Sequence, residues 1–203
     1  PRGIVITPNG TALVADYSNN QIRLITLSTA SVSLLAGSSS GNVDGVGSNA
    51  KFYYPTGIDI SSNGNYALIG DYNNNQIRKI IISTATTTTL AGQSTSGYVD
   101  GVGSNAKFSN PYGVAISPSG NSALVVDYYN NRIRQVILST ASVSTLAGGS
   151  SLNGNVDGVG SNAKFNYPSG LSVSPDDSFL LISDYSNNMI RQIILSTQQV
   201  TLL

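Results

Sequence analysis

Carboxylate and guanidinium groups recur in this sequence at a fixed spacing, and they are its most conspicuous candidates for chemistry. Residues 16–23 read Asp-Tyr-Ser-Asn-Asn-Gln-Ile-Arg, and closely similar segments return three times. The interval is about 56 residues, a period typical of repeat arrays and β-propellers. The four pairs are Asp16 and Arg23, Asp71 and Arg78, Asp127 and Arg134, and Asp184 and Arg191.

The repetition favours a structural role for these pairs. If the two Asn at 19–20 form a two-residue hairpin turn, Asp16 lies directly opposite Arg23. Such a cross-strand ion pair contributes about 0.2–1 kcal/mol and helps to fix the strand register. The alternative is a ring of ligand-binding Asp or Arg side chains around a central channel. Catalytic sites break the symmetry of a repeat, so four equal copies favour the structural interpretation.

Other catalytic chemistry has few candidates. The chain contains no His and no Cys, so the usual nucleophile–base triads lack their base. Loops that begin at Asp44, Asp100 and Asp157 superficially resemble calcium loops, but each offers one carboxylate, whereas calcium prefers several among six to eight oxygen ligands. Asp176 and Asp177 stand in a turn and are interpreted as solvated. We therefore expect no catalytic, metal-binding or cofactor-binding residues, and no enzyme activity.

Tyrosine is the abundant aromatic residue, with 11 copies. The Tyr that follows each repeated Asp is interpreted as stacking between repeat units. Tyr53, Tyr112 and Tyr129 are better candidates for contact with a protein or a sugar, because Tyr suits such surfaces. Asn9 begins the sequon Asn-Gly-Thr, in a predicted exposed turn, and is a candidate glycosylation site if the protein is eukaryotic and secreted.

The composition limits the classes of partner. The net charge is +0 and only 10% of the 203 residues are charged, against about 25% in an average soluble domain. A neutral chain has no field to steer nucleic acid, and no apolar run approaches the roughly 20 residues that span a bilayer. Such a neutral, hydroxyl-rich surface favours a secreted or cell-surface location. Residues 1–3 already lie inside a repeat, so we expect the natural N-terminus to be processed or absent.

Each repeat unit reads as four short antiparallel strands. The motif Pro-x-Gly opens a unit and is followed by an alternating run such as residues 4–6, typical of a half-buried strand. A turn rich in Pro, Asn and Gly follows, and then three further strands that begin near residues 12, 22 and 32. Four-stranded units at this period are typical of propeller blades.

The predicted fold is therefore an all-β propeller in a single domain, 1–203, or a fragment of one. Long connections link the fourth strand of each blade to the first strand of the next. The predicted blades are 1–37, 55–92, 111–148 and 168–203, and the connecting loops are 38–54, 93–110 and 149–167.

The sequence resembles the NHL-repeat family of β-propellers over its whole length. The resemblance rests on the Pro-x-Gly-Val/Ile motif, the Asp and Asn-Asn of each hairpin, the Arg-Ile-Arg of residues 132–134, and Leu-Ala-Gly (146–148) followed by Asp157-Gly158. The family often has His where the second Asn stands here. Its propellers usually close with six blades, whereas this chain supplies four. The sequence therefore does not decide whether the ring closes. The resemblance implies a fold and no particular activity.

Together these observations predict a non-enzymatic extracellular module for protein interaction or self-assembly, either in a filament or in a larger parent protein. If the ring is open, both terminal blades expose apolar faces that another copy or further blades would cover. A carbohydrate-binding propeller is the alternative, and a sensor or enzyme fragment is a weaker one. We expect a protein partner or self-association, with a glycan as the alternative ligand, and neither nucleic-acid binding nor membrane insertion.

Overall fold

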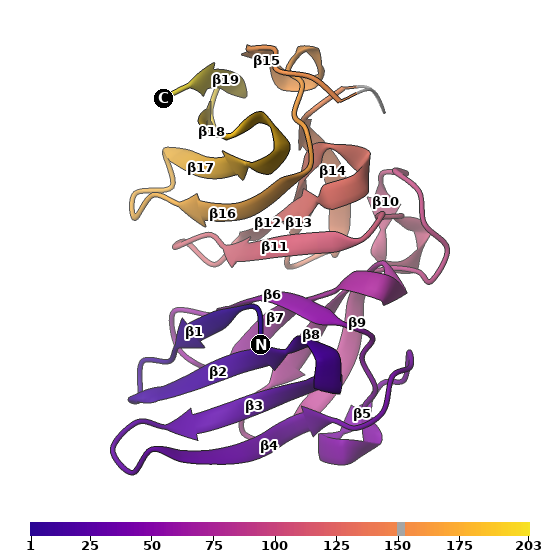
Figure 1. Cartoon of the computed structure of the whole chain (residues 1–203), viewed down its shortest axis with the longest axis vertical. Coiled ribbons are helices and arrows are strands. Elements are labelled where there is room, and N and C mark those ends of the chain that lie inside the picture. Colours follow the sequence, from indigo (N-terminus) through magenta and orange to yellow (C-terminus); the bar gives the residue numbers. More distant parts are fainter. Residues whose placement is uncertain (150–152) are drawn as a thin grey trace.

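The chain folds into four antiparallel β-sheets that follow one another around an axis (Figure 1). The computed structural model describes residues 1–149 and 153–203. We call the sheets blades 1 to 4 in chain order. Blade 1 has the strand order β1-β2-β3-β4, and blades 2 to 4 each add a short fifth strand at the outer edge.

The strands and the short 3-10 turns have the following bounds. Blade 1 consists of β1 (Ile4–Ile6), β2 (Thr11–Asp16), η1 (Tyr17–Asn19), β3 (Gln21–Thr26) and β4 (Ser31–Gly37). Blade 2 consists of β5 (Gly45–Val46), η2 (Gly47–Asn49), β6 (Pro55–Ile60), β7 (Tyr66–Asp71), η3 (Tyr72–Asn74), β8 (Gln76–Ile81) and β9 (Thr86–Gly92). Blade 3 consists of β10 (Gly101–Val102), η4 (Gly103–Asn105), β11 (Pro111–Ile116), β12 (Ser122–Asp127), η5 (Tyr128–Asn130), β13 (Arg132–Ile137) and β14 (Ser142–Ala147). Blade 4 consists of β15 (Gly158–Val159), η6 (Gly160–Asn162), β16 (Pro168–Val173), β17 (Phe179–Asp184), η7 (Tyr185–Asn187), β18 (Met189–Ile194) and β19 (Gln199–Leu202).

The long connections do more than link blades. In loop 38–54, β5 pairs antiparallel with β9, so the loop that leaves blade 1 supplies the outer edge of blade 2. The same arrangement joins β10 to β14 and β15 to β19. Within loop 149–167, residues 150–152 lie outside the described part of the structure. Each loop therefore belongs structurally to the blade that follows it.

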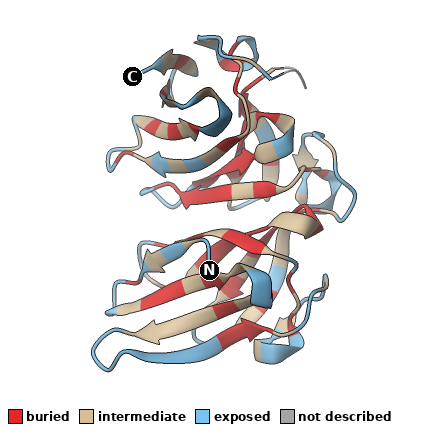
Figure 2. Cartoon of the chain, in the orientation of Figure 1, coloured by how far each residue is buried: buried red, intermediate tan, exposed pale blue. Residues whose placement is uncertain are grey.

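The hydrophobic core of the described residues is divided into three clusters, one between each pair of neighbouring blades. Between blades 1 and 2, Leu13 and Ile22 pack in one cluster with Ile58, Ile69 and the loop residue Phe52. Equivalent clusters join blade 2 to blade 3 and blade 3 to blade 4. In Figure 2 the buried segments lie between the sheets, whereas the outer strand of blade 1 is largely exposed.

The first long strand of each blade lies next to the axis. β1, β6, β11 and β16 pack against one another in succession. The glycine of the Pro-x-Gly motif permits this close approach in blades 1 to 3: a Cβ on Gly57 would overlap the Tyr112 carbonyl oxygen of the next blade, and one on Gly113 would lie 2.7 Å from the Ser169 carbonyl oxygen.

The predicted register of the Asp–Arg hairpin is wrong by two residues. Asp71 pairs with Gln76, and Arg78 pairs with Ile69, in place of a direct pairing of Asp71 with Arg78. The reason is the turn: residues 72–74 form a 3-10 turn, and only Asn75 is left-handed, with φ of 55°. A slip of two residues keeps every side chain on its predicted face, so Arg78 remains diagonal to Asp71 and within reach of it.

Among the helical segments of residues 1–149 and 153–203, none has the length and apolar character needed to cross a membrane.

Candidate functional site

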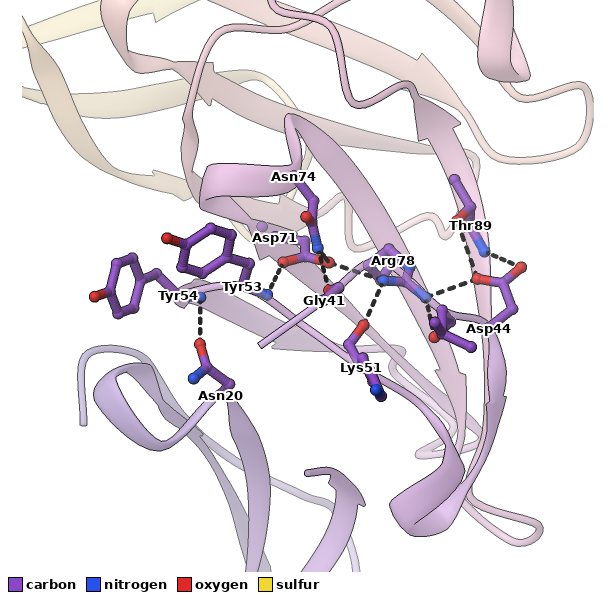
Figure 3. A network of polar contacts seen from close by, with 12 residues as sticks. Asn20, Gly41, Asp44, Lys51, Tyr53, Tyr54, Asp71, Asn74, Arg78 and Thr89 are labelled. Carbon is purple, nitrogen blue, oxygen red and sulfur yellow. Dashed lines mark hydrogen bonds and ion pairs between the residues drawn. The ribbon is translucent and has the colours of Figure 1, made fainter. Parts of the chain in front are cut away.

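In blades 2 to 4 the repeated Asp and Arg form compact ion clusters between the blade and the long loop that precedes it. In blade 2 the Arg78 guanidinium donates from Nη1 to Asp71 Oδ2 at 2.8 Å and from Nη2 to Asp44 Oδ1 at 2.6 Å (Figure 3). It also donates to the carbonyl oxygens of Lys51 and Val43, both at 3.0 Å. The side chains of Arg78 and Asp71 are fully buried, so the cluster neutralises charges that the fold has removed from water.

The second carboxylate of the cluster comes from the long loop. Asp44 accepts the Thr89 backbone N–H at 3.1 Å and the Thr89 hydroxyl at 3.0 Å, which fastens the loop to β9. Phe52, from the same loop, lies under the guanidinium at 5.2 Å from its ring centre. From the sequence, Asp44 was considered only as part of a calcium-like loop, and this long-range ion pair was not predicted.

Burial acts on the carboxyl that the cluster encloses. It raises the pKa of Asp71 to about 6, and the Arg78 charge and the hydrogen bonds from Asn74 and the Tyr53 N–H oppose that rise. The pKa of Asp127 is raised to about 6 by the same causes. The hydrogen bonds also fasten the long loop to its blade, because Asn74 donates to the Gly41 carbonyl of the preceding loop at 2.7 Å.

Among the residues that the structure describes, the cluster recurs in blades 3 and 4 but not in blade 1. Arg134 joins Asp127 and Asp100, and Arg191 joins Asp184 and Asp157. The equal treatment of all four pairs is therefore wrong for Asp16 and Arg23. Among the described contacts, Asp16 accepts from Asn19 and faces the N-terminal amine, whereas Arg23 Nε donates to the Ser33 carbonyl at 3.2 Å.

The difference has a physical cause in the long loop. Each complete cluster takes one Asp and two carbonyls from the loop that precedes its blade, and no such loop precedes blade 1 within this sequence. The Arg side chains of the three complete clusters are fully buried, so they cannot contact a ligand. This geometry supports the structural interpretation of these pairs.

The tyrosines gather at one end of the axis. The Tyr rings that follow the repeated Asp contact each other across blades 1 to 3: the ring centres of Tyr17 and Tyr72 are 6.5 Å apart, and those of Tyr72 and Tyr128 are 6.4 Å apart. They surround a hollow of about 260 Å³. Its lining residues are Arg2, Tyr17, Tyr72, Tyr112, Tyr128, Ser169 and Tyr185.

The three Tyr predicted as contact residues join this aromatic group. Tyr112 lines the hollow, and its ring centre is 5.6 Å from that of Tyr128. Tyr129 is 51% exposed and packs edge-on against Tyr128 at 5.0 Å, and Tyr53 is 38% exposed beside Tyr54. Sequence reasoning missed that Arg2 and Ser169 meet these rings, although both occupy the x position of Pro-x-Gly.

Two further predicted features are turns. Asn9 is exposed, as its sequon requires, and its side-chain oxygen accepts from the hydroxyl groups of Thr7 and Thr11. Hydrogen bonds from Ser174 and Ser178 lower the pKa of Asp176 to about 2. Asp177 accepts the Ser119 N–H at 3.0 Å and so joins the turn of blade 4 to that of blade 3.

The acidic loops offer little to a metal ion. Across residues 1–149 and 153–203, no three His, Cys, Asp or Glu side chains gather in a way that could hold one.

The chain is similar to known proteins in sequence and in structure. It is 29% identical to human NHL repeat-containing protein 2 over 163 residues, which is 76% of this chain and 22% of that protein. It is 33% identical to Protein SUPPRESSOR OF QUENCHING 1, chloroplastic, of Arabidopsis thaliana over 148 residues, which is 68% of this chain and 14% of that protein. The chain thus spans about a fifth of the length of the curated relatives it matches. No protein-family model matches it.

Solved structures with the same fold cover nearly the whole chain. An auxiliary nutrient binding protein from Bacteroides thetaiotaomicron aligns with 98% of it, with a TM-score of 0.75 and 23% identity, over 47% of that structure. Virginiamycin B lyase from Staphylococcus aureus aligns with 100% of it, with a TM-score of 0.67 and 19% identity, over 55% of that structure. At these identities the likeness shows the fold alone. The repeated motifs, the four successive blades and the relatives named for the NHL repeat together support the NHL-repeat family of β-propellers for this chain.

Proposed function

We propose that this chain is a non-enzymatic assembly module whose two end blades join further blades of the same kind. In the isolated chain, those blades come from a second copy that packs head to tail. In a longer parent protein they come from neighbouring repeats. The observation that carries the proposal is the exposure of apolar residues on the two outer faces, at positions that are buried inside the array.

Blade 1 has one such face. Ile4 is 65% exposed, whereas Ile58, which holds the same position in blade 2, is 6% exposed. Val32 is 54% exposed, and its counterpart Thr87 is fully buried. Arg23 lies beside Val32, so the face combines an apolar surface with one partly exposed guanidinium.

Blade 4 has the complementary face. Ile190 is 47% exposed, whereas Ile22, Ile77 and Ile133 at the same position are fully buried. Leu203 is 65% exposed, and its counterpart Leu35 is 9% exposed. Inside the array, Ile22 and Leu35 share a cluster with Ile58, so Ile190 and Leu203 of one copy fit against Ile4 of the next. Contacts between unlike faces produce rings or filaments.

The chemistry of the chain supports an assembly role over catalysis. Three of the four repeated Arg and six Asp are committed to the buried clusters. The sequence has no His or Cys to supply a base or nucleophile. Its low charge supports a secreted or cell-surface location, which is part of the proposal.

The test is the molar mass of the isolated chain by light scattering over a wide range of concentration. We expect the mass to rise above 21.1 kDa with concentration. Ile4→Lys and Ile190→Lys should each keep the chain monomeric, because a head-to-tail junction needs both faces. Val102→Lys is the matched control, since Val102 is 54% exposed on an inner blade, and it should behave as the unmodified chain does. A monomer at every concentration would contradict the proposal.

A further inference from the structure

The x residue of the Pro-x-Gly motif differs among the four repeats, as does the second residue after the Gly of that motif. The x residue of the Pro-x-Gly motif is Arg2, Thr56, Tyr112 and Ser169 in blades 1 to 4, between a Pro and a Gly that never change. All four border the axis between the innermost strands. Thr56 is buried and bonds the Tyr112 carbonyl at 2.9 Å, whereas the other three line the tyrosine hollow. Arg2, Tyr112 and Ser169 therefore bring three different polar groups to the edge of the same hollow.

Arg2 provides the charge of this site. Among the residues that line the hollow it is the one ionised group, and no carboxylate is among them. Its guanidinium lies 4.7 Å from the centre of the Tyr17 ring and donates to the Tyr112 hydroxyl at 2.5 Å. An Arg held over aromatic rings is preorganised to bind a carboxylate in two-pronged fashion.

The tyrosines provide neutral donors and flat apolar faces. Burial raises the pKa of Tyr72 and of Tyr128, and neighbouring tyrosines raise both further. Their hydroxyls therefore remain protonated at neutral pH and can donate to oxygen. The rings around the hollow are tilted relative to one another, so they offer faces and edges to a ligand from several sides.

We propose that the tyrosine hollow binds the ring of an acidic sugar, a uronic acid, with its carboxylate on Arg2 and its C–H face against the tyrosine rings. The volume of about 260 Å³ lies just below the range of about 300–1,000 Å³ that is typical of ligand pockets, which fits one ring better than a long segment. Tyr and Ser hydroxyls match the hydroxyl groups of such a ring. The proposal does not depend on the assembly role.

Two simpler ligands each lack part of this match. A neutral sugar leaves Arg2 without its charged partner, and a carboxylate without a polyhydroxylated ring leaves the tyrosine and Ser169 hydroxyls unused. D-galacturonate and D-galactose form the matched pair of probes, because they differ at the carboxylate carbon, and benzoate tests the carboxylate without the sugar.

Tyrosine fluorescence measures the binding, since the chain has 11 Tyr and no Trp. We expect D-galacturonate to bind at least about tenfold more tightly than D-galactose or benzoate. Arg2→Gln should weaken D-galacturonate binding about tenfold and leave D-galactose binding unchanged, because a charge-assisted pair is lost. Arg2 is exposed, so the variant should retain the circular dichroism spectrum and melting temperature of the unmodified chain.

Arg132→Gln is the matched control. Arg132 lies 4.4 Å from the ring centre of Tyr98 and so forms the same kind of pair away from the hollow. It should bind D-galacturonate as the unmodified chain does. The proposal is overturned if D-galacturonate does not bind at millimolar concentration, if D-galactose or benzoate binds equally well, or if Arg2→Gln keeps the preference for the acid.

Discussion

At the residue scale, the same Asp–Arg motif has two different environments in one chain. Arg134 is fully buried, between Asp127 at 2.8 Å and Asp100 at 2.5 Å. Arg23 is partly exposed and bonds one carbonyl, that of Ser33. Removing one member of a buried ion cluster leaves the opposite charge without compensation, whereas replacing an exposed Arg changes the free energy of unfolding little. The sequence position within the repeat therefore does not set the energetic value of the pair.

This difference predicts unequal effects of one substitution at two equivalent positions. Arg134→Met should lower the free energy of unfolding by about 3–5 kcal/mol, because Asp127 would remain buried and unpaired. Arg23→Met should change it by no more than about 0.5 kcal/mol, as for other surface substitutions. Urea denaturation followed by circular dichroism measures both. Equal losses of unfolding free energy at the two sites would show that the second carboxylate and the burial of Arg134 contribute nothing to stability.

Sequence reasoning predicted the first partner of the three buried Arg but not the second. Asp71 was identified from its constant spacing to Arg78 in the sequence. Asp44 lies much earlier in the chain, in the long loop that precedes the blade. The sequence did contain a signal for the second partner. The Asp-Gly-Val-Gly loop occurs three times, and each copy precedes one of the three Arg that are buried. Arg23 has no such loop before it in this sequence and is not buried. A periodic pattern shows which residues repeat, but not which repeats meet in space.

At the element scale, the strands were predictable and the turns were less so. The alternation at residues 4–6 and the Asn-Gly turns mark strands that the structure contains. The hairpin turn was predicted with two residues and has four, 72–75 in blade 2, because the Asn74 amide donates to Asp71 at 2.8 Å and stabilises a 3-10 turn. Such a bond between side chains depends on local geometry, which strand periodicity does not contain.

The end of each fourth strand has its own constraint. Gly92 ends β9 with φ of 91°, and a Cβ there would overlap the Asn75 carbonyl oxygen and lie 2.9 Å from Phe108. Gly10 has a similar φ of 80°, but a Cβ there would meet no atom within 4 Å. Both glycines permit a left-handed backbone, and only Gly92 also permits close packing between a strand and the next loop.

Two alanine substitutions separate these roles. Gly10→Ala should cost about 1 kcal/mol of unfolding free energy, from the left-handed backbone alone. Gly92→Ala should lower the unfolding free energy by roughly 1–3 kcal/mol more than Gly10→Ala does, because the added methyl group overpacks the turn and displaces Phe108. Melting temperatures measured by calorimetry compare the two variants. If they are equally stable, close packing at Gly92 is not a constraint on the blade.

At the scale of the whole molecule, stability is distributed over three junctions. Blades 2 and 3 each take part in two apolar clusters, whereas blades 1 and 4 each take part in one. In arrays where each unit contacts only its neighbours, stability is approximately a sum of unit and junction terms, and the end units open most readily. The order of the blades was predictable from the repeat, but the division of the core into junctions needed the packing.

Amide hydrogen exchange should reveal this gradient. We expect the slowest exchange in β7, β8, β12 and β13, whose blades are covered on both faces, and faster exchange in β3, β4, β18 and β19, because local opening at the ends breaks one junction. The concentration dependence then tests the assembly role. If copies pack head to tail, raising the concentration should slow exchange in the end blades and leave the inner blades unchanged, and Ile190→Lys should abolish that effect. Equal exchange in all four blades would mean that the array opens as one cooperative unit, and slower inner exchange at high concentration would place the contact between copies somewhere other than the end faces.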